Sequence, residues 1–136
     1  MQDKVKDLCI YRIKSALESL EVTRVCIDGK HYKDAINRSY YASFYAVKAV
    51  LALEGTDFKR HKDVVAYFNK NFVATEIFEK KIGRLLANLQ QTRETSDYDD
   101  FFIASKEDAE TQYLNAKNII EAVEKYIEDK FGYNML

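Results

Sequence analysis

Arg93 is the side chain of this sequence whose position most clearly demands a partner of opposite charge. It follows Leu89 by one helical turn on an apolar face, and the acidic stretch 96–100 comes soon after it. A guanidinium on such a face needs a carboxylate or a phosphate, because an unpaired charge is costly to bury. Asp97, four residues later, would supply a purely structural ion pair. The alternative is an anion site in which Arg93 holds a phosphate through two parallel donors.

A second group of chemically useful residues lies on one face of the helical pattern that ends near residue 53. Its members are basic or aromatic, where an exposed face normally carries Glu, Lys and Gln: Arg38, Tyr41, Tyr45 and Lys48. Such a face favours contact with a second protomer, or with an RNA or nucleotide whose bases stack on tyrosine. In the plainer interpretation, the tyrosines complete the core and keep their hydroxyls at its rim.

Other catalytic patterns are weak. The sequence contains no glycine-rich phosphate loop, no metal-ligand cluster and no Ser/His/Asp grouping at a recognised spacing, so we expect neither a metal nor a cofactor. His61, in the basic run 59–62, is a weak candidate for acid–base chemistry. Cys9 and Cys26 lack metal-ligand spacing and are expected to be small core residues in a reducing compartment, which indicates a cytoplasmic protein.

Helices must position these residues, because the chain has no proline, only four glycines, and apolar residues at helical spacing almost throughout. The pattern predicts an all-α fold, namely an antiparallel four-helix bundle with an additional short helix, in a single domain over residues 1–136. Helices are expected over residues 3–27, 31–53, 60–71, 76–92 and 105–131. A long loop is expected over 95–104, with a capping box formed by Ser105 and Asp108.

The charge balance limits the classes of partner. There are 21 Lys and Arg against 22 Asp and Glu, which leaves a net charge of −1, so any contact with RNA must be local. No apolar run is long enough for a signal or membrane segment, and we expect no membrane association.

Three segments carry a family resemblance. They are residues 32–42, which read YKDAINRSYYA, residues 61–73, which end in Asn-Phe-Val, and residues 93–98, which read RETSDY. In this order they resemble the HEPN superfamily, in particular its small stand-alone bacterial and archaeal members, over nearly the whole chain. The resemblance implies a helical bundle that forms a homodimer. It also implies a cytosolic module often paired with a minimal nucleotidyltransferase in toxin–antitoxin operons.

Many members of that superfamily are metal-independent RNases. The resemblance implies that their Arg, followed after four to six residues by His, lies in a cleft built by two protomers. Arg93 matches the arginine, but Tyr98 stands where the relatives carry histidine. A phenol with an ordinary pKa of about 10 is a poor general base near neutral pH, so the sequence leaves open whether the protein is an enzyme.

Three hypotheses follow. In the first, a dimeric HEPN-like module binds RNA or a nucleotide through Arg93, Tyr98 and the Arg38/Tyr41 face, and is paired with a nucleotidyltransferase in a toxin–antitoxin or stress and defence context. In the second, the protein is an active endoribonuclease toxin, with Tyr98 or His61 moving protons beside Arg93. In the third, it is a structural dimerisation protein without catalytic activity.

Overall fold

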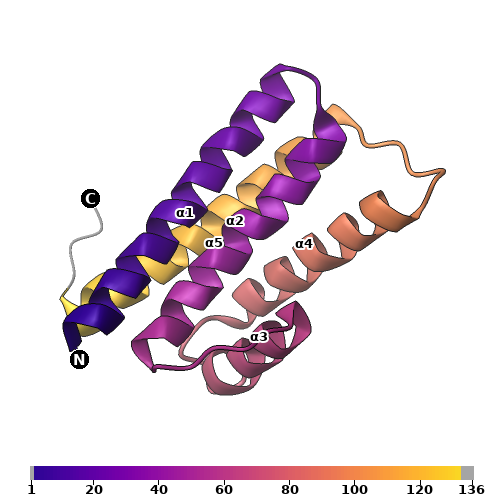
Figure 1. The fold of residues 1–136 in the computed structure, drawn as a ribbon. Coiled ribbons are helices and arrows are strands. Elements are labelled where there is room, and N and C mark those ends of the chain that lie inside the picture. The colour runs from indigo at the N-terminus through magenta and orange to yellow at the C-terminus, as the bar shows by residue number, and fades with distance from the viewer. Residues whose placement is uncertain (1, 133–136) are drawn as a thin grey trace.

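The computed structural model describes residues 2–132, and α-helices account for most of them. The helices are α1 (Gln2–Asp28), α2 (Tyr32–Leu53), α3 (His61–Phe68), α4 (Lys80–Tyr98) and α5 (Lys106–Phe131). The four long helices form an antiparallel bundle, in which α2 contacts α1, α4 and α5, and the short α3 lies across one end beside the start of α4 (Figure 1). The all-α fold, a four-helix bundle with one additional short helix, is therefore confirmed.

The central helix α2 buries a row of small side chains. Five of them form a stripe with no exposed surface, Ala35, Ser39, Ala42, Ala46 and Ala49. Short side chains let neighbouring helix backbones approach closely, which explains how α2 can contact three long helices at once. The adjacent bulky stripe is also buried and fills the core: Ile36, Tyr40, Phe44, Val47 and Leu51.

The ends of the helices follow local signals in the sequence. Gly55 adopts the left-handed conformation with φ of 67°, which favours glycine, and terminates α2 as its position predicts. Ser105 accepts a hydrogen bond from the Asp108 N–H, and the Asp108 carboxylate accepts one from the Ser105 N–H. The predicted capping box at the start of α5 is therefore confirmed.

The bounds of α4 differ from the prediction at both ends. The helix begins at Lys80 instead of residue 76, because Glu76 takes a left-handed φ of 65° and Phe78 enters the core from the connecting segment. The helix also continues through Tyr98, so the predicted loop shrinks to residues 99–105. Ser96 is buried within this last turn. The helix therefore continues although residues 96–98 are mostly polar.

The predicted third helix is also shorter than expected. Its regular α-helical hydrogen bonding ends at Phe68, and Asn69–Val73 continues it as one π-helical turn. In this wider turn the N–H of Ala74 donates to the carbonyl of Asn69. Phe72 of the π turn remains buried, so this segment still closes the end of the bundle.

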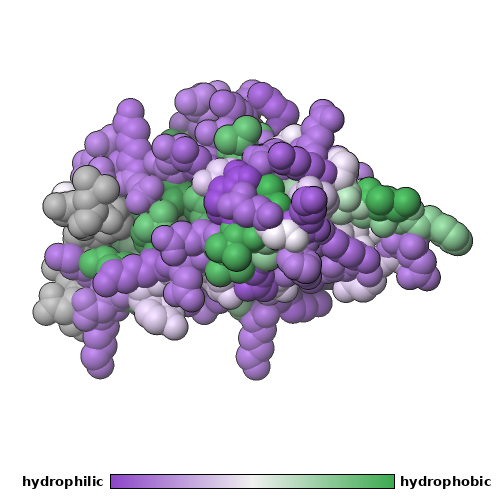
Figure 2. Space-filling view, turned by 90° about the horizontal axis from the view of Figure 1, so that it is seen from above, coloured by the Kyte–Doolittle hydropathy of each residue, from purple (hydrophilic) through white to green (hydrophobic). Residues whose placement is uncertain are grey.

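The exposed surface is mostly polar, with local apolar exceptions. Phe101 and Ile103 are 92% and 87% exposed in the loop between α4 and α5. Figure 2 shows apolar atoms projecting at the right-hand end of the molecule, where Figure 1 has this loop. Over the part of the chain that the structure describes, no helix combines the length and apolar character needed to cross a membrane.

Candidate functional site

Arg93 projects from α4 onto two consecutive aromatic rings of α2. Its Cζ atom lies 5.3 Å from the ring centroid of Tyr40 and 5.5 Å from that of Tyr41. Its Nη2 donates a hydrogen bond of 3.4 Å to the Tyr41 hydroxyl. The Arg93 side chain is only 20% exposed. The ring faces are the negative ends of the aromatic quadrupoles, so they stabilise a positive charge that has little access to water.

Asp97 neutralises part of that charge from within the same helix. Its Oδ2 lies 3.0 Å from Nε of Arg93, one turn earlier. The Nε–H is not directed at the carboxylate, so the contact is an ion pair without a hydrogen bond. Among the described residues no group accepts a hydrogen bond from Nη1 of Arg93. This part of the guanidinium is therefore available to a further anion.

His61, the first residue of α3, lies against the same aromatic group. Its ring centroid is 4.1 Å from that of Phe44 and 5.7 Å from that of Tyr41. Its Nδ1 is 3.4 Å from the Tyr40 hydroxyl oxygen, and which of the two donates depends on the imidazole tautomer. Nε2 has no hydrogen-bond partner within the described part of the chain. The structure thus places the histidine at the same aromatic cluster as Arg93.

Burial and positive neighbours set the protonation states of this group. Partial burial lowers the pKa of His61 below its ordinary value of 6.5, and the charges of Arg93 and Lys48 lower it further. The imidazole is therefore neutral near pH 7. Burial raises the pKa of Tyr40 to about 12, although the charge of Arg93 opposes the shift. The Tyr40 phenol consequently keeps its proton, and the cluster presents one fixed cation beside one neutral imidazole.

The remaining basic and aromatic residues continue outward from Tyr41 along α2. The Arg38 guanidinium lies 5.1 Å from the Tyr41 ring centroid, and the Tyr45 ring lies 6.3 Å from it. Lys48 points to Asp57, with Nζ 3.4 Å from Oδ1. The predicted face of α2 therefore forms a surface that begins beside Arg93.

Tyr98 is not brought into the cluster. It lies five residues after Arg93, about 140° further round the helix axis, and its side chain is 77% exposed. Arg93 instead contacts Tyr40 and Tyr41. Sequence reasoning assigned Tyr40 to the core stripe and did not connect it with Arg93 or His61, because this contact depends on how α2, α3 and α4 pack.

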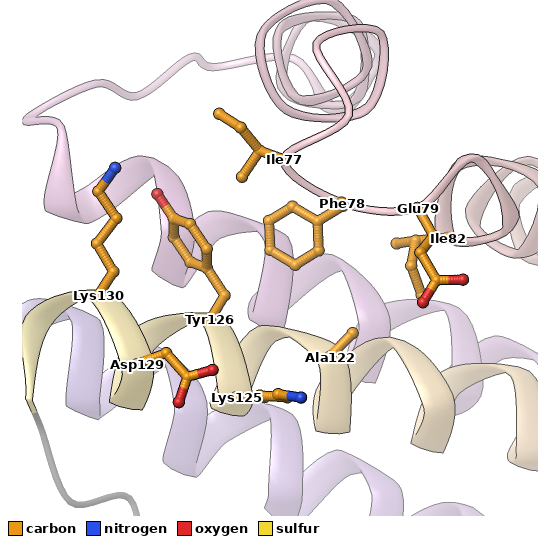
Figure 3. A pocket seen from close by; sticks show the side chains of 9 residues that line it. All are labelled: Ile77, Phe78, Glu79, Ile82, Ala122, Lys125, Tyr126, Asp129 and Lys130. Carbon is orange, nitrogen blue, oxygen red and sulfur yellow. The ribbon is translucent and has the colours of Figure 1, made fainter.

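A cavity of about 320 Å³ elsewhere contains none of these residues. It lies between α5 and the segment that precedes α4, where Phe78 and Tyr126 stand side by side with ring centroids 5.0 Å apart (Figure 3). Two lysines and two carboxylates surround its apolar wall: Lys125, Lys130, Glu79 and Asp129. Across the described residues, no group of three or more His, Cys, Asp and Glu is placed to hold a metal ion. The Arg93 cluster is therefore the stronger candidate for chemistry.

Comparison with known proteins places this chain in a family. The HEPN domain matches residues 11–126 of the chain. A protein of Thermotoga maritima named "UPF0332 protein" is 33% identical over 129 residues, which cover 95% of this chain and 97% of the relative. Two proteins of Methanocaldococcus jannaschii, each named "Putative toxin", are 30% and 28% identical. These matches cover 87% and 86% of this chain, and 80% and 87% of the relatives.

Proposed function

The chain belongs to the HEPN family, and on that premise we propose that it is a toxin-like module that binds RNA at the Arg93 cluster. The observation that carries the proposal is the sheltered guanidinium, which two tyrosine rings hold beside a neutral histidine. A phosphodiester would bind to the free Nη1 edge of Arg93. The half-buried ring of Tyr41 next to it, and that of Tyr45 beyond, suit the faces of unpaired bases.

The toxin-like role is supported by relatives that carry the word toxin in their names and align over most of this chain. We propose that the protein acts as a homodimer and is controlled by a minimal nucleotidyltransferase partner. Both partners follow from the family resemblance. The local basic and aromatic face of α2 is consistent with RNA binding despite the net charge of −1.

Cleavage of the bound RNA is a second candidate function, and the position of His61 favours it. If Nδ1–H donates to the Tyr40 oxygen, Nε2 is free to take the proton of a ribose 2′-hydroxyl. The 2′-oxygen then attacks phosphorus, the P–O5′ bond breaks, and the 5′-oxygen takes a proton from water. Arg93 would stabilise the charge that develops on the phosphate oxygens. The products are a 2′,3′-cyclic phosphate and a 5′-hydroxyl.

One experiment separates binding from cleavage. Purified wild type, Arg93→Ala, His61→Asn and Arg84→Ala are incubated with total RNA in the presence of a chelator, and binding of a labelled RNA is measured in parallel. Arg84 is an exposed cation of α4, so its removal controls for the loss of one positive charge from the same helix. Circular dichroism establishes that each variant is folded.

The outcomes distinguish the two functions. Cleavage lost in both Arg93→Ala and His61→Asn, and kept in Arg84→Ala, would establish the RNase. Binding that depends on Arg93, without cleavage by any form, would support the RNA-binding module alone. Equal RNA binding by wild type and folded Arg93→Ala would reject the proposed site.

A further inference from the structure

A groove between α1 and α2 borders the same aromatic face. It has a volume of about 480 Å³, within the range of about 300–1,000 Å³ that is usual for small-molecule sites. Its α2 wall carries three residues of the basic and aromatic face, and its α1 wall carries polar and aromatic side chains: Arg38, Tyr45, Lys48, Tyr11, Arg12 and Ser15. The surface that starts at the Arg93 cluster and follows α2 therefore continues across the groove onto α1.

Arg38 is the available cation of this groove. Within the described chain it forms no ion pair, and its Nη2 donates only to the amide oxygen of the neighbouring Asn37, at 3.2 Å. The side chain is half-buried and rests on the Tyr41 ring. A partly sheltered guanidinium without a carboxylate suits a phosphate, which accepts two parallel hydrogen bonds from it.

Two further cations are held in fixed positions at the groove. Arg12 donates through Nη1 to the carbonyl of Lys48 at 2.9 Å, and through Nη2 to Oδ2 of Asp57 at 3.1 Å. Lys48 shares the same carboxylate. Glu18 is the carboxylate among the residues that line the groove. The local charge therefore favours an anion, and Arg38 is the group free to bind it.

Aromatic rings from both helices accompany these charges. Tyr11 of α1 is 68% exposed, and Tyr45 of α2 is half-buried, so each offers ring surface to a ligand. Stacking of nucleic-acid bases on aromatic side chains requires base faces that are not already stacked in a duplex. A phosphate-binding cation that lines the same groove as two such rings suits a nucleotide of a single strand.

Tyr41 connects the groove to the Arg93 cluster. Its hydroxyl accepts a hydrogen bond from Arg93, and its ring lies under the Arg38 guanidinium. An RNA strand bound at Arg93 would therefore pass the Tyr41 ring and then reach Arg38. The two guanidinium groups face the same ring from different elements, α4 and α2.

We infer that the groove is a second nucleotide subsite, with a phosphate on Arg38 and a base on Tyr11 and Tyr45. The ligand is then a single-stranded RNA that spans both sites, not an isolated nucleotide or a duplex. This inference rests on the proposed function, because it extends the strand bound at Arg93.

The test measures binding by fluorescence anisotropy with 2′-O-methyl RNA, which lacks the 2′-hydroxyl and is not cleaved by attack of that group. The probes are a dinucleotide, a single-stranded octanucleotide and the octanucleotide in a duplex. The variants are Arg38→Ala, Tyr11→Leu, Glu18→Gln and Arg93→Ala, with Arg84→Ala as the control for charge.

We expect Arg38→Ala and Tyr11→Leu each to weaken octanucleotide binding at least about fivefold, because phosphate and stacking contacts are worth that much or more. Arg38→Ala also reduces the salt dependence of binding by about one phosphate contact. Glu18→Gln strengthens binding because it removes a negative charge from the groove. Tyr11→Leu leaves binding of the dinucleotide unchanged, because Arg93 holds the dinucleotide and Tyr11 lies outside the Arg93 cluster.

Three results would overturn the inference. The first is octanucleotide binding that Arg38→Ala and Tyr11→Leu leave unchanged while Arg93→Ala weakens it, and this outcome spares the proposed function. The second is equal affinity for the single strand and the duplex. The third is octanucleotide binding that none of these variants alters, or no binding at all, and this outcome rejects the proposed function as well.

Discussion

Replacing Arg93 with methionine distinguishes a structural role of this arginine from a functional one. The structural role predicts a loss of stability, and the functional role also predicts a loss of RNA affinity. Methionine keeps an unbranched apolar stem on the rings of Tyr40 and Tyr41 and removes the charge. The ion pair with Asp97 is partly exposed and contributes about 0.2–1 kcal/mol. Each ring contact of the guanidinium contributes about 0.5–1 kcal/mol. The free energy of unfolding should therefore fall by about 1–3 kcal/mol.

The size of the domain converts this loss into a melting temperature. Unfolding entropy of about 2.1 cal/mol/K per residue makes 1 kcal/mol equivalent to about 3–4 °C for a chain of 136 residues. We expect the Arg93→Met variant to melt about 4–10 °C below wild type and to remain folded at 25 °C. Thermal denaturation followed by circular dichroism measures the shift.

RNA affinity gives the second quantity. Loss of a charged hydrogen bond to a phosphate costs about 1.5–3 kcal/mol, which corresponds to a decrease in affinity of about 10- to 150-fold. Arg93→Lys keeps the charge but not the two-pronged geometry, so its affinity should fall between those of wild type and Arg93→Met. A lowered melting temperature with unchanged RNA affinity would refute the functional assignment and leave Arg93 as one half of an ion pair.

Three further changes test the fold and the protonation of the cluster by thermal denaturation. Ser105→Ala removes the capping box of α5 and should cost about 0.5–2 kcal/mol, whereas Ser15→Ala serves as a nearly neutral control, because the half-buried Ser15 hydroxyl lies within α1 and donates to the Tyr11 carbonyl of the same helix. Ala46→Leu should destabilise the protein by about 1–3 kcal/mol or more, because the extra methylene groups meet a fully buried stripe, and an unchanged melting temperature would contradict the close approach at α2. The pKa of His61 is lowered on folding, so the unfolded chain binds the proton more readily than the folded one. The contribution of His61 to stability is therefore complete above about pH 7.5 and is lost as the pH falls through 6.5. His61→Gln should remove that part of the pH dependence, and an identical stability profile from about pH 8 to about pH 5 would show that the histidine is not sheltered.

Helical periodicity was sufficient to predict the bundle, because α2 and α5 have apolar residues at nearly every inward position. It failed at the end of α4, where local composition and tertiary structure disagree. Ser96 and Asp97 are of types common in loops, yet Ser96 is buried and Asp97 pairs with Arg93 one turn earlier. Asp97 can thus occupy the last turn of the helix because Arg93 supplies a partner, which composition alone does not reveal.

The candidate site was predictable only in part, for a related reason. Arg93 stands out because a cation on an apolar face needs a partner, and both Asp97 and the tyrosine face of α2 supply one. The contribution of His61 depends on how the segment after Gly55 returns to α2. No spacing in the sequence encodes that return, since Tyr40 and His61 are 21 residues apart.

Photo-crosslinking is the most direct test of where RNA binds. Wild type and Arg93→Met are irradiated with a single-stranded RNA that contains 4-thiouridine, and mass spectrometry identifies the crosslinked peptides. The account predicts crosslinks to the α2 peptide that contains Tyr40 and Tyr41 and to the peptide that contains His61, with lower yield in Arg93→Met. Crosslinks confined to other surfaces, such as the cavity beside Phe78 and Tyr126, with equal yield from both proteins, would contradict it.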